Sequence, residues 1–202
     1  MSFKTVSVTS STGYALELEE IKDHLYIGKG ETDKDDYLKA IRDVAEDYVK
    51  DITGRELLQE TNKAYFDNWP TGKKYDHFDL PFSPLISVPS SGVVYTDSDG
   101  NSTTFSSTAW SVDIASEPGR LVLGYNDDWP SVTLDNNNPI SIEFVAGYST
   151  ARKVPSSIKQ AMLLIIGHLY ENRETVIIGQ GLTPVNVPFA VNTLLANKRV
   201  KL

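Results

Sequence analysis

Residues 154–173, VPSSIKQAMLLIIGHLYENR, form the stretch that decides the fold. Its apolar residues recur at helical spacing, and the stripe that they form covers most of the helix circumference. A helix of this kind must be buried on several sides. Pro155 suits the first helical turn because its missing N–H would be unsatisfied there anyway, and Ser157 with Gln160 predicts a capping box. The stretch therefore predicts a central buried helix from Pro155 to Asn172.

A second long helix is predicted from Asp36 to Thr53. Asp33 and Asp35 favour its N-terminus through capping and the helix dipole, and Gly54 supplies a left-handed stop. We expect this helix to pack against the central one, because each has a wide apolar stripe that the other can cover. The apolar residues follow the i, i+3, i+4 pattern without a break: Tyr37, Leu38, Ile41, Val44, Ala45, Tyr48, Val49 and Ile52.

Two shorter helices are also predicted. The last one runs from Phe189 to Asn197, with its apolar residues on one face, and joins the two long helices in one helical layer. The first one is marked by four apolar residues and is expected to end near two glycines: Leu16, Leu18, Ile21, Leu25, Gly28 and Gly30.

Between Lys63 and Gly147 the sequence changes to short β-branched and aromatic runs bounded by turn residues. Asp99-Gly100 predicts a hairpin turn. The fold class is therefore α+β, a small helical bundle of residues 1–62 and 150–202 with an inserted antiparallel β domain of residues 63–149. The candidate strands are 64–66, 77–80, 85–88, 93–96, 103–105, 110–114, 120–123 and 140–145.

Composition excludes several classes of chemistry. The chain of 202 residues has no cysteine, which rules out disulfides, cysteine nucleophiles and thiolate metal sites. The three histidines, His24, His77 and His168, lack metal-ligand spacing, so neither a structural metal nor a cofactor is expected. We find no signal-peptide core and no apolar run of the roughly 18 residues that a membrane span needs, so we expect a soluble protein.

The net charge of -8 argues against a nucleic-acid binder, because affinity for the phosphate backbone comes from clustered Lys and Arg. The charge is unevenly distributed. Residues 151–202 hold seven basic and two acidic residues, which leaves 12 of the 19 basic and 25 of the 27 acidic residues in the first 150. An acidic body therefore carries a basic C-terminal end.

Some local patterns resemble known sites but fit turns or packing better. Asp97, Asp99 and Asn101 have the start of a calcium loop, but the glycine stands at the fourth position and no Glu stands at the twelfth. The aromatic residues of the β region could line a sugar-binding face, although such residues more often pack in a core. They are Trp69, Trp129, Tyr65, Tyr75, Tyr95 and Tyr125. Nothing in the sequence selects a catalytic group, and we expect no enzymatic activity.

An ordered set of short strings resembles the head-tail connector (adaptor) proteins of tailed bacteriophages, which are also described as DNA-packaging proteins. The resemblance covers nearly the whole chain. The strings are Leu18 to Leu25 (LEEIKDHL), Ala45 to Val49 (AEDYV), Thr53 to Arg55 (TGR), Asp113 with Ser116 to Arg120 (SEPGR), Phe144 to Tyr148 (FVAGY), Val154-Pro155, Ile158 to Ala161 (IKQA), Gly167 to Glu174 (GHLYENRE) and Pro188-Phe189.

The resemblance implies a non-enzymatic structural subunit of a virion ring, commonly of twelve copies. Such a ring docks beneath the portal protein, contacts a tail-side connector or stopper protein, and extends the channel through which DNA passes without sequence-specific binding. The implied location is the head-tail junction of a virion assembled in the host cytoplasm. An acidic body suits such a channel because it would repel the phosphate backbone. The alternative is a β-sheet carbohydrate- or protein-binding accessory module of a virion.

The expected contact residues lie in the C-terminal third. An apolar segment interrupted by Gly and Pro cannot satisfy its side chains in solvent, and a basic tail can face an acidic partner. We therefore expect contacts with the portal or a neighbouring subunit through Val176, Ile177, Ile178, Leu182, Val185, Val187, Phe189, Lys198, Arg199 and Lys201.

Overall fold

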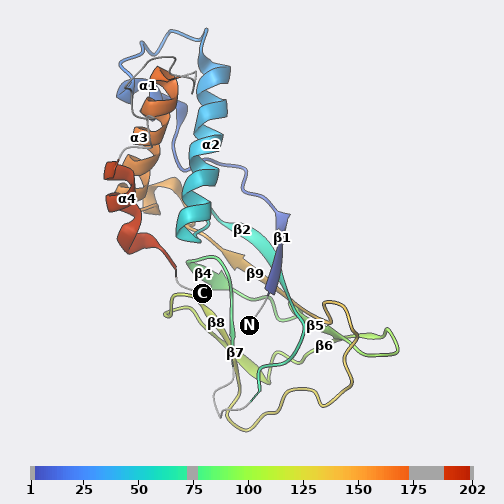
Figure 1. Ribbon diagram of the computed structural model, residues 1–202. Coiled ribbons are helices and arrows are strands. Elements are labelled where there is room, and N and C mark those ends of the chain that lie inside the picture. The colour runs from blue at the N-terminus through green and yellow to red at the C-terminus, as the bar shows by residue number, and fades with distance from the viewer. Residues whose placement is uncertain (1–2, 72–76, 173–188, 201–202) are drawn as a thin grey trace, which may run out of the picture. The chain divides into compact units, whose positions relative to one another are not determined.

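The computed structural model describes residues 3–71, 77–172 and 189–200, which form two compact units (Figure 1). A helical unit comprises residues 13–57 and 150–199, and a sheet unit comprises residues 1–12, 58–149 and 200–202. The helices and antiparallel sheets confirm the predicted α+β fold class.

The helical unit contains α1 (Leu18–His24), α2 (Asp35–Thr53), α3 (Ser156–Glu171) and α4 (Phe189–Leu195), with short 3-10 turns η1 (Ala151–Lys153) and η2 (Ala196–Lys198). Each predicted helix is present. α2 and α3 run antiparallel, because the Tyr37 hydroxyl at the start of α2 donates to the Leu169 carbonyl at the end of α3 over 2.9 Å. The apolar faces meet as predicted, and the fully buried residues include Leu38, Ala45, Val49, Ile158, Ala161, Met162, Ile166, Val191 and Leu195.

Some helix ends differ from the predictions. Gly54 takes the left-handed conformation with φ 65° and ends α2, as expected. The capping box at Ser157 is wrong, because α3 begins at Ser156 with Pro155 as its N-cap and has no side-chain cap. Asp33 does not cap α2 either, since Lys34 holds the N-cap position. α1 ends before the two glycines, and Tyr26 takes the left-handed conformation there.

The sheet unit is built on β2 (Glu60–Phe66) and β9 (Ile140–Ala146), which pair antiparallel in one unbroken register with alternating burial. β1 (Phe3–Thr9), β4 (Leu85–Ser87), β5 (Val93–Thr96) and β6 (Ser102–Thr104) complete this sheet. A second sheet contains β3 (His77–Asp79), β8 (Arg120–Leu123) and β7 (Trp110–Asp113). All eight predicted strands are present, and β5 and β6 form the predicted hairpin.

Strand β1 was not predicted. Sequence analysis grouped residues 1–62 with the helices, whereas β1 pairs with β2 along the edge of the sheet. Its register joins Phe3 to Phe66 and Thr5 to Ala64. The side chains of Val6 and Val8 are about half exposed, at 55% and 50%, so little apolar burial marks the strand in the sequence.

The core of the sheet unit contains the tryptophans that could have lined a sugar-binding face. Trp69 is 7% exposed and stacks on Trp129, with ring centroids 5.0 Å apart and an interplanar angle of 15°. Phe78 and Phe105 surround the pair. The tryptophan rings therefore serve core packing. Tyr75 lies outside the described residues.

Candidate functional site

Only part of the expected contact surface falls within the described residues. Phe189 begins α4, Lys198 ends η2, and Arg199 follows as an exposed residue. The other expected contact residues lie outside the described ranges: Val176, Ile177, Ile178, Leu182, Val185, Val187 and Lys201.

A buried arginine fixes the start of the basic tail. Arg55, which is 6% exposed, donates from Nε to the backbone carbonyl oxygen of Lys198 over 2.7 Å. Since α2 and α3 are antiparallel, the end of α2 lies near the start of α3, which η1 precedes with exposed Arg152 and Lys153. One end of the helical unit therefore gathers basic side chains from three separate parts of the chain. Sequence analysis missed the contribution of η1.

The solvent face of α2 is acidic. Asp36, Asp43, Asp47 and Asp51 are exposed along it, at spacings that place them on one side of the helix. Asp43 pairs with Arg42, whose nearly buried guanidinium lies over the Tyr14 ring at 3.2 Å from the centroid. This acidic face repels phosphate and attracts cationic side chains.

Ion pairs of limited exposure hold the ends of the helices together. Lys22 of α1 is 4% exposed, donates to the Glu31 carbonyl over 2.7 Å and pairs with the Asp35 carboxylate at the start of α2. Lys159 of α3 pairs with Glu20 at 3.1 Å. These pairs fix the segment between α1 and α2, and they assign Lys22 and Lys159 of the connector-like strings a structural role.

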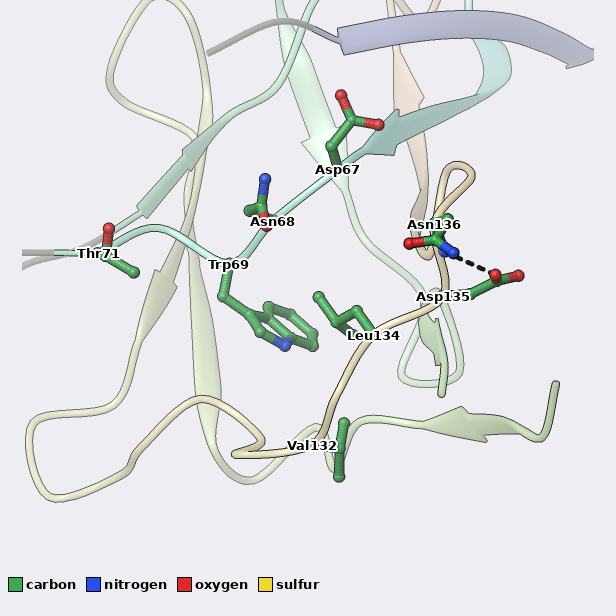
Figure 2. A pocket seen from close by; sticks show the side chains of 8 residues that line it. All are labelled: Asp67, Asn68, Trp69, Thr71, Val132, Leu134, Asp135 and Asn136. Atoms are coloured by element: carbon green, nitrogen blue, oxygen red, sulfur yellow. Dashed lines mark hydrogen bonds between the residues drawn. The ribbon is translucent and has the colours of Figure 1, made fainter. Parts of the chain in front are cut away.

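A pocket of about 460 Å³ opens beside the end of β2 (Figure 2). Its polar wall contains Asp67, Asn68, Asp135 and Asn136, and the Asn136 backbone N–H donates to the Asp135 carboxylate over 2.6 Å. Trp69 contributes to the wall, although its ring packs in the core. Among the described residues, no group of three His, Cys, Asp or Glu side chains could hold a metal ion.

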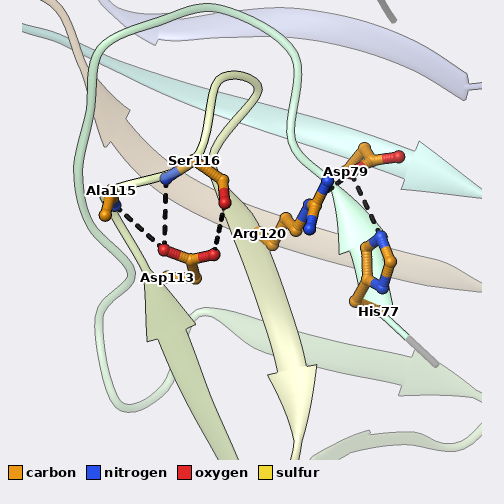
Figure 3. A network of polar contacts seen from close by, with 6 residues as sticks. All are labelled: His77, Asp79, Asp113, Ala115, Ser116 and Arg120. Carbon is orange, nitrogen blue, oxygen red and sulfur yellow. Dashed lines mark hydrogen bonds and ion pairs between the residues drawn. The ribbon is translucent and has the colours of Figure 1, made fainter. Parts of the chain in front are cut away.

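The SEPGR string forms the turn between β7 and β8 (Figure 3). The Asp113 carboxylate accepts bonds from the backbone N–H groups of Ala115 and Ser116 and from the Ser116 hydroxyl, and these bonds lower the pKa of Asp113. Arg120 donates to Asp79 over 3.2 Å, and His77 lies 3.4 Å from the same carboxylate oxygen. The bonds to Asp113 hold the turn closed, and the contacts of Asp79 join β3 to Arg120 of β8.

Asp97 plays a similar part in the β5–β6 hairpin. Its Oδ1 accepts bonds from the backbone N–H groups of Asp99 and Asn101 over 3.0 and 2.8 Å. The bonds from Asn101 are the main cause of the lowered pKa of Asp97. This geometry supports the turn interpretation of the sequence over the calcium loop.

No helix within the described ranges combines the length and the hydropathy that crossing a lipid bilayer would require.

Comparisons with known proteins point to one class. The sequence model of the phage gp6-like head-tail connector proteins matches residues 15–107, which include α1, α2 and five of the strands. No curated protein shows significant sequence similarity to the chain. This match confirms, over residues 15–107, the resemblance to head-tail connector proteins that the sequence predicts.

Solved structures of gene transfer agent particles contain chains of the same fold. A chain in the neck of an empty gene transfer agent particle, computed with C6 symmetry, matches with a TM-score of 0.73 and 22% identity over 98% of this chain and 96% of that one. Chains in the native virion and in the native neck, computed with C12 symmetry, match with TM-scores of 0.74 and 0.71 and 21% identity over the same shares. The chain therefore shares its whole fold with these particle proteins.

Proposed function

We propose that the chain is a structural subunit of a ring at the head-tail junction of a phage-like particle. The connector match over residues 15–107, together with a shared fold over 98% of the chain, carries this proposal. The particle necks with this fold were computed with C6 and C12 symmetry, and we propose a ring of twelve copies here. The ring assembles in the host cytoplasm and becomes part of the virion.

In this proposal the ring docks beneath the portal protein, extends the DNA channel, and meets a tail-side connector or stopper protein. Its work is mechanical, with no catalytic step. The net charge of -8 supports a channel through which DNA slides, because carboxylates repel the phosphate backbone and lower non-specific binding.

The helical part, with the segment 176–187, Phe189 and the basic residues Lys198, Arg199 and Lys201, makes the contacts with the portal and neighbouring copies. The bond between Arg55 and the Lys198 carbonyl supports this assignment, because it fixes the position from which the basic tail departs.

Native mass spectrometry and electron microscopy of the purified chain test the proposal. We expect closed rings, in equilibrium with monomers of 22.4 kDa, whose subunit number follows from the mass. The rings should not retard duplex DNA in a gel at physiological salt. A chain that stays monomeric at every concentration, or rings that bind duplex DNA tightly, would contradict the proposal.

A further inference from the structure

Tyr26 occupies an unusual backbone position at the end of α1. The Tyr26 N–H bonds to the Asp23 carbonyl and the Ile27 N–H bonds to the Lys22 carbonyl over 2.9 Å, which is the pattern of a Schellman motif. Tyr26 itself takes the left-handed conformation, with φ 56°. Glycine or asparagine normally stands at this position, because a Cβ is strained there. Here a tyrosine takes this conformation, although Gly28 and Gly30 follow only two and four residues later.

The side chain of Tyr26 is 98% exposed, so the described residues of its own chain offer almost no packing that would offset the backbone strain. Strained residues concentrate at functional sites, and tyrosine is one of the residues that contribute most to protein interfaces. Lys29, which is 64% exposed, lies three residues further on, and its only ion pair within the described structure is a long one of 3.9 Å with Asp23. The loop after α1 therefore presents an aromatic ring and a cation together.

A matching surface lies on the solvent face of α2. Val44 is 55% exposed, and exposed Ala40 lies one helical turn before it. Asp43 and Asp47 flank this small apolar patch with negative charge. The two small side chains of the patch leave room above them for an aromatic ring, and its carboxylates complement a nearby lysine.

We propose that Tyr26 of one copy packs on the Ala40–Val44 patch of the next copy, with Lys29 facing Asp47. The two surfaces are different and belong to the same unit, so the contact is heterologous, and its repetition generates a ring when the rotation between copies closes. A second copy is the occupant that the charges favour, because the chain carries both the cationic aromatic loop and its acidic apolar complement. The inference rests on the proposed ring and names a contact that forms it.

The variant Tyr26→Gly separates assembly from folding. Glycine relieves the strained conformation, so the melting temperature should stay the same or rise. Assembly should weaken at least tenfold in the dissociation constant measured by sedimentation, because an aromatic anchor is lost. Tyr125→Ser is the matched control: it removes another tyrosine, 71% exposed on the sheet unit, and should leave assembly unchanged.

Cysteine crosslinking tests the pairing itself, and the absence of native cysteines makes it specific. When the single variants Tyr26→Cys and Val44→Cys are mixed and treated with a short bismaleimide, a crosslinked dimer should form that neither variant gives alone. Ile114→Cys, at a 60% exposed position on the sheet unit, replaces Val44→Cys as the control and should give no dimer with Tyr26→Cys.

A charge exchange completes the test. Lys29→Glu should weaken assembly several-fold, and Asp47→Lys in the same chain should restore it, because both copies then carry the reversed pair. Normal assembly of Tyr26→Gly together with no mixed crosslink would overturn this contact while the ring itself stands. A wild-type chain that never self-associates would overturn the contact and the proposed ring together.

Discussion

Arg55 and Lys198 are joined by a hydrogen bond of 2.7 Å from the arginine Nε to the lysine backbone carbonyl, although 142 residues separate them in the chain. The arginine side chain is buried, so the bond connects the end of α2 to the end of η2 in a region of low solvent exposure. The pairing depends on the side chain of one residue and only on the backbone of the other.

That asymmetry allows a controlled test. Arg55→Ala should lower the free energy of unfolding by about 1.5–3 kcal/mol, the range for hydrogen bonds to charged groups. It should also speed amide hydrogen exchange in α4. Lys198→Ala keeps the carbonyl acceptor and should change neither measurement. Equal effects of the two variants would show that the bond does not hold the tail.

The buried face of α3 gives a second prediction. Ile165 is 5% exposed, and Ile165→Asp places an unpaired charge in the helical core. We expect a loss of at least about 3 kcal/mol in the free energy of unfolding, measured by denaturant titration. Gln160→Asp, at an exposed position of the same helix, should change it by less than about 0.5 kcal/mol. An unchanged midpoint for Ile165→Asp would contradict the burial of α3.

Substitutions at three glycines distinguish the stability cost of backbone strain from that of steric overlap. At Gly147, φ is +110° and an added Cβ would lie 2.0 Å from the Leu58 carbonyl oxygen, so Gly147→Ala should cost about 2 kcal/mol or more. Gly100 has φ +83° in open space, so Gly100→Ala should cost only about 1 kcal/mol. Gly30→Ala has neither problem and should be near neutral. Thermal unfolding of the three variants should follow this order, and equal costs at Gly100 and Gly147 would contradict the overlap.

Glu46 should make stability depend on pH. Burial raises the pKa of its carboxyl, and the charge of Lys50 and the backbone N–H of Ala15 oppose this only in part. The folded state therefore keeps its proton to higher pH than the unfolded state, so stability falls as pH rises from the usual glutamate range through the folded pKa. Glu46→Gln should be more stable than wild type at pH 7. At pH values below the usual glutamate pKa, the melting temperatures of Glu46→Gln and the wild type should coincide. A stability advantage of Glu46→Gln that is the same at every pH would contradict the raised pKa of Glu46.

The basic tail should matter for assembly and not for folding. Reversing the charges of Lys198, Arg199 and Lys201 to Glu should slow docking to portal-bearing particles, because exposed interface charges mainly steer association. The circular dichroism spectrum and melting temperature should stay unchanged. The same three residues changed to Gln give the control, with an intermediate effect. Normal docking of the Glu variant would show that the tail takes no part in the contact.

The helices were predictable because their apolar residues recur over several turns. α2 and α3 begin within one residue of their predicted starts and end within one residue of their predicted ends. The strands between Lys63 and Gly147 were also found, since turn residues separate their β-branched runs. The missed strand β1 has exposed side chains along most of its length, and its position depends on the backbone ladder with β2. Backbone hydrogen bonds between two strands require no alternation of apolar side chains, so the sequence carries no pattern that marks β1.

The site was less predictable than the fold. The basic tail could be identified from composition, but its connection to Arg55 depends on a backbone carbonyl that no side-chain pattern reveals. Glycine is the usual residue in the left-handed conformation after a helix, so the sequence points to Gly28 or Gly30 as the end of α1. It gives no sign that Tyr26 takes this conformation. A tryptophan in the sequence can belong to a sugar-binding face or to a core. Only the burial seen in the three-dimensional structure shows that these tryptophans pack in the core.

The order of the two units along the chain affects how the protein folds as it leaves the ribosome. The nine strands in the described part of the chain lie between residues 3 and 146, whereas α2 must wait for α3 to cover its apolar face. At roughly 5–20 residues per second, synthesis of the intervening strands takes on the order of 5–20 seconds. During that interval the apolar face of α2 is open to chaperones or to the wrong chain, while the strands can already pair. Residues 156–195 therefore complete a helical layer that residues 18–53 began.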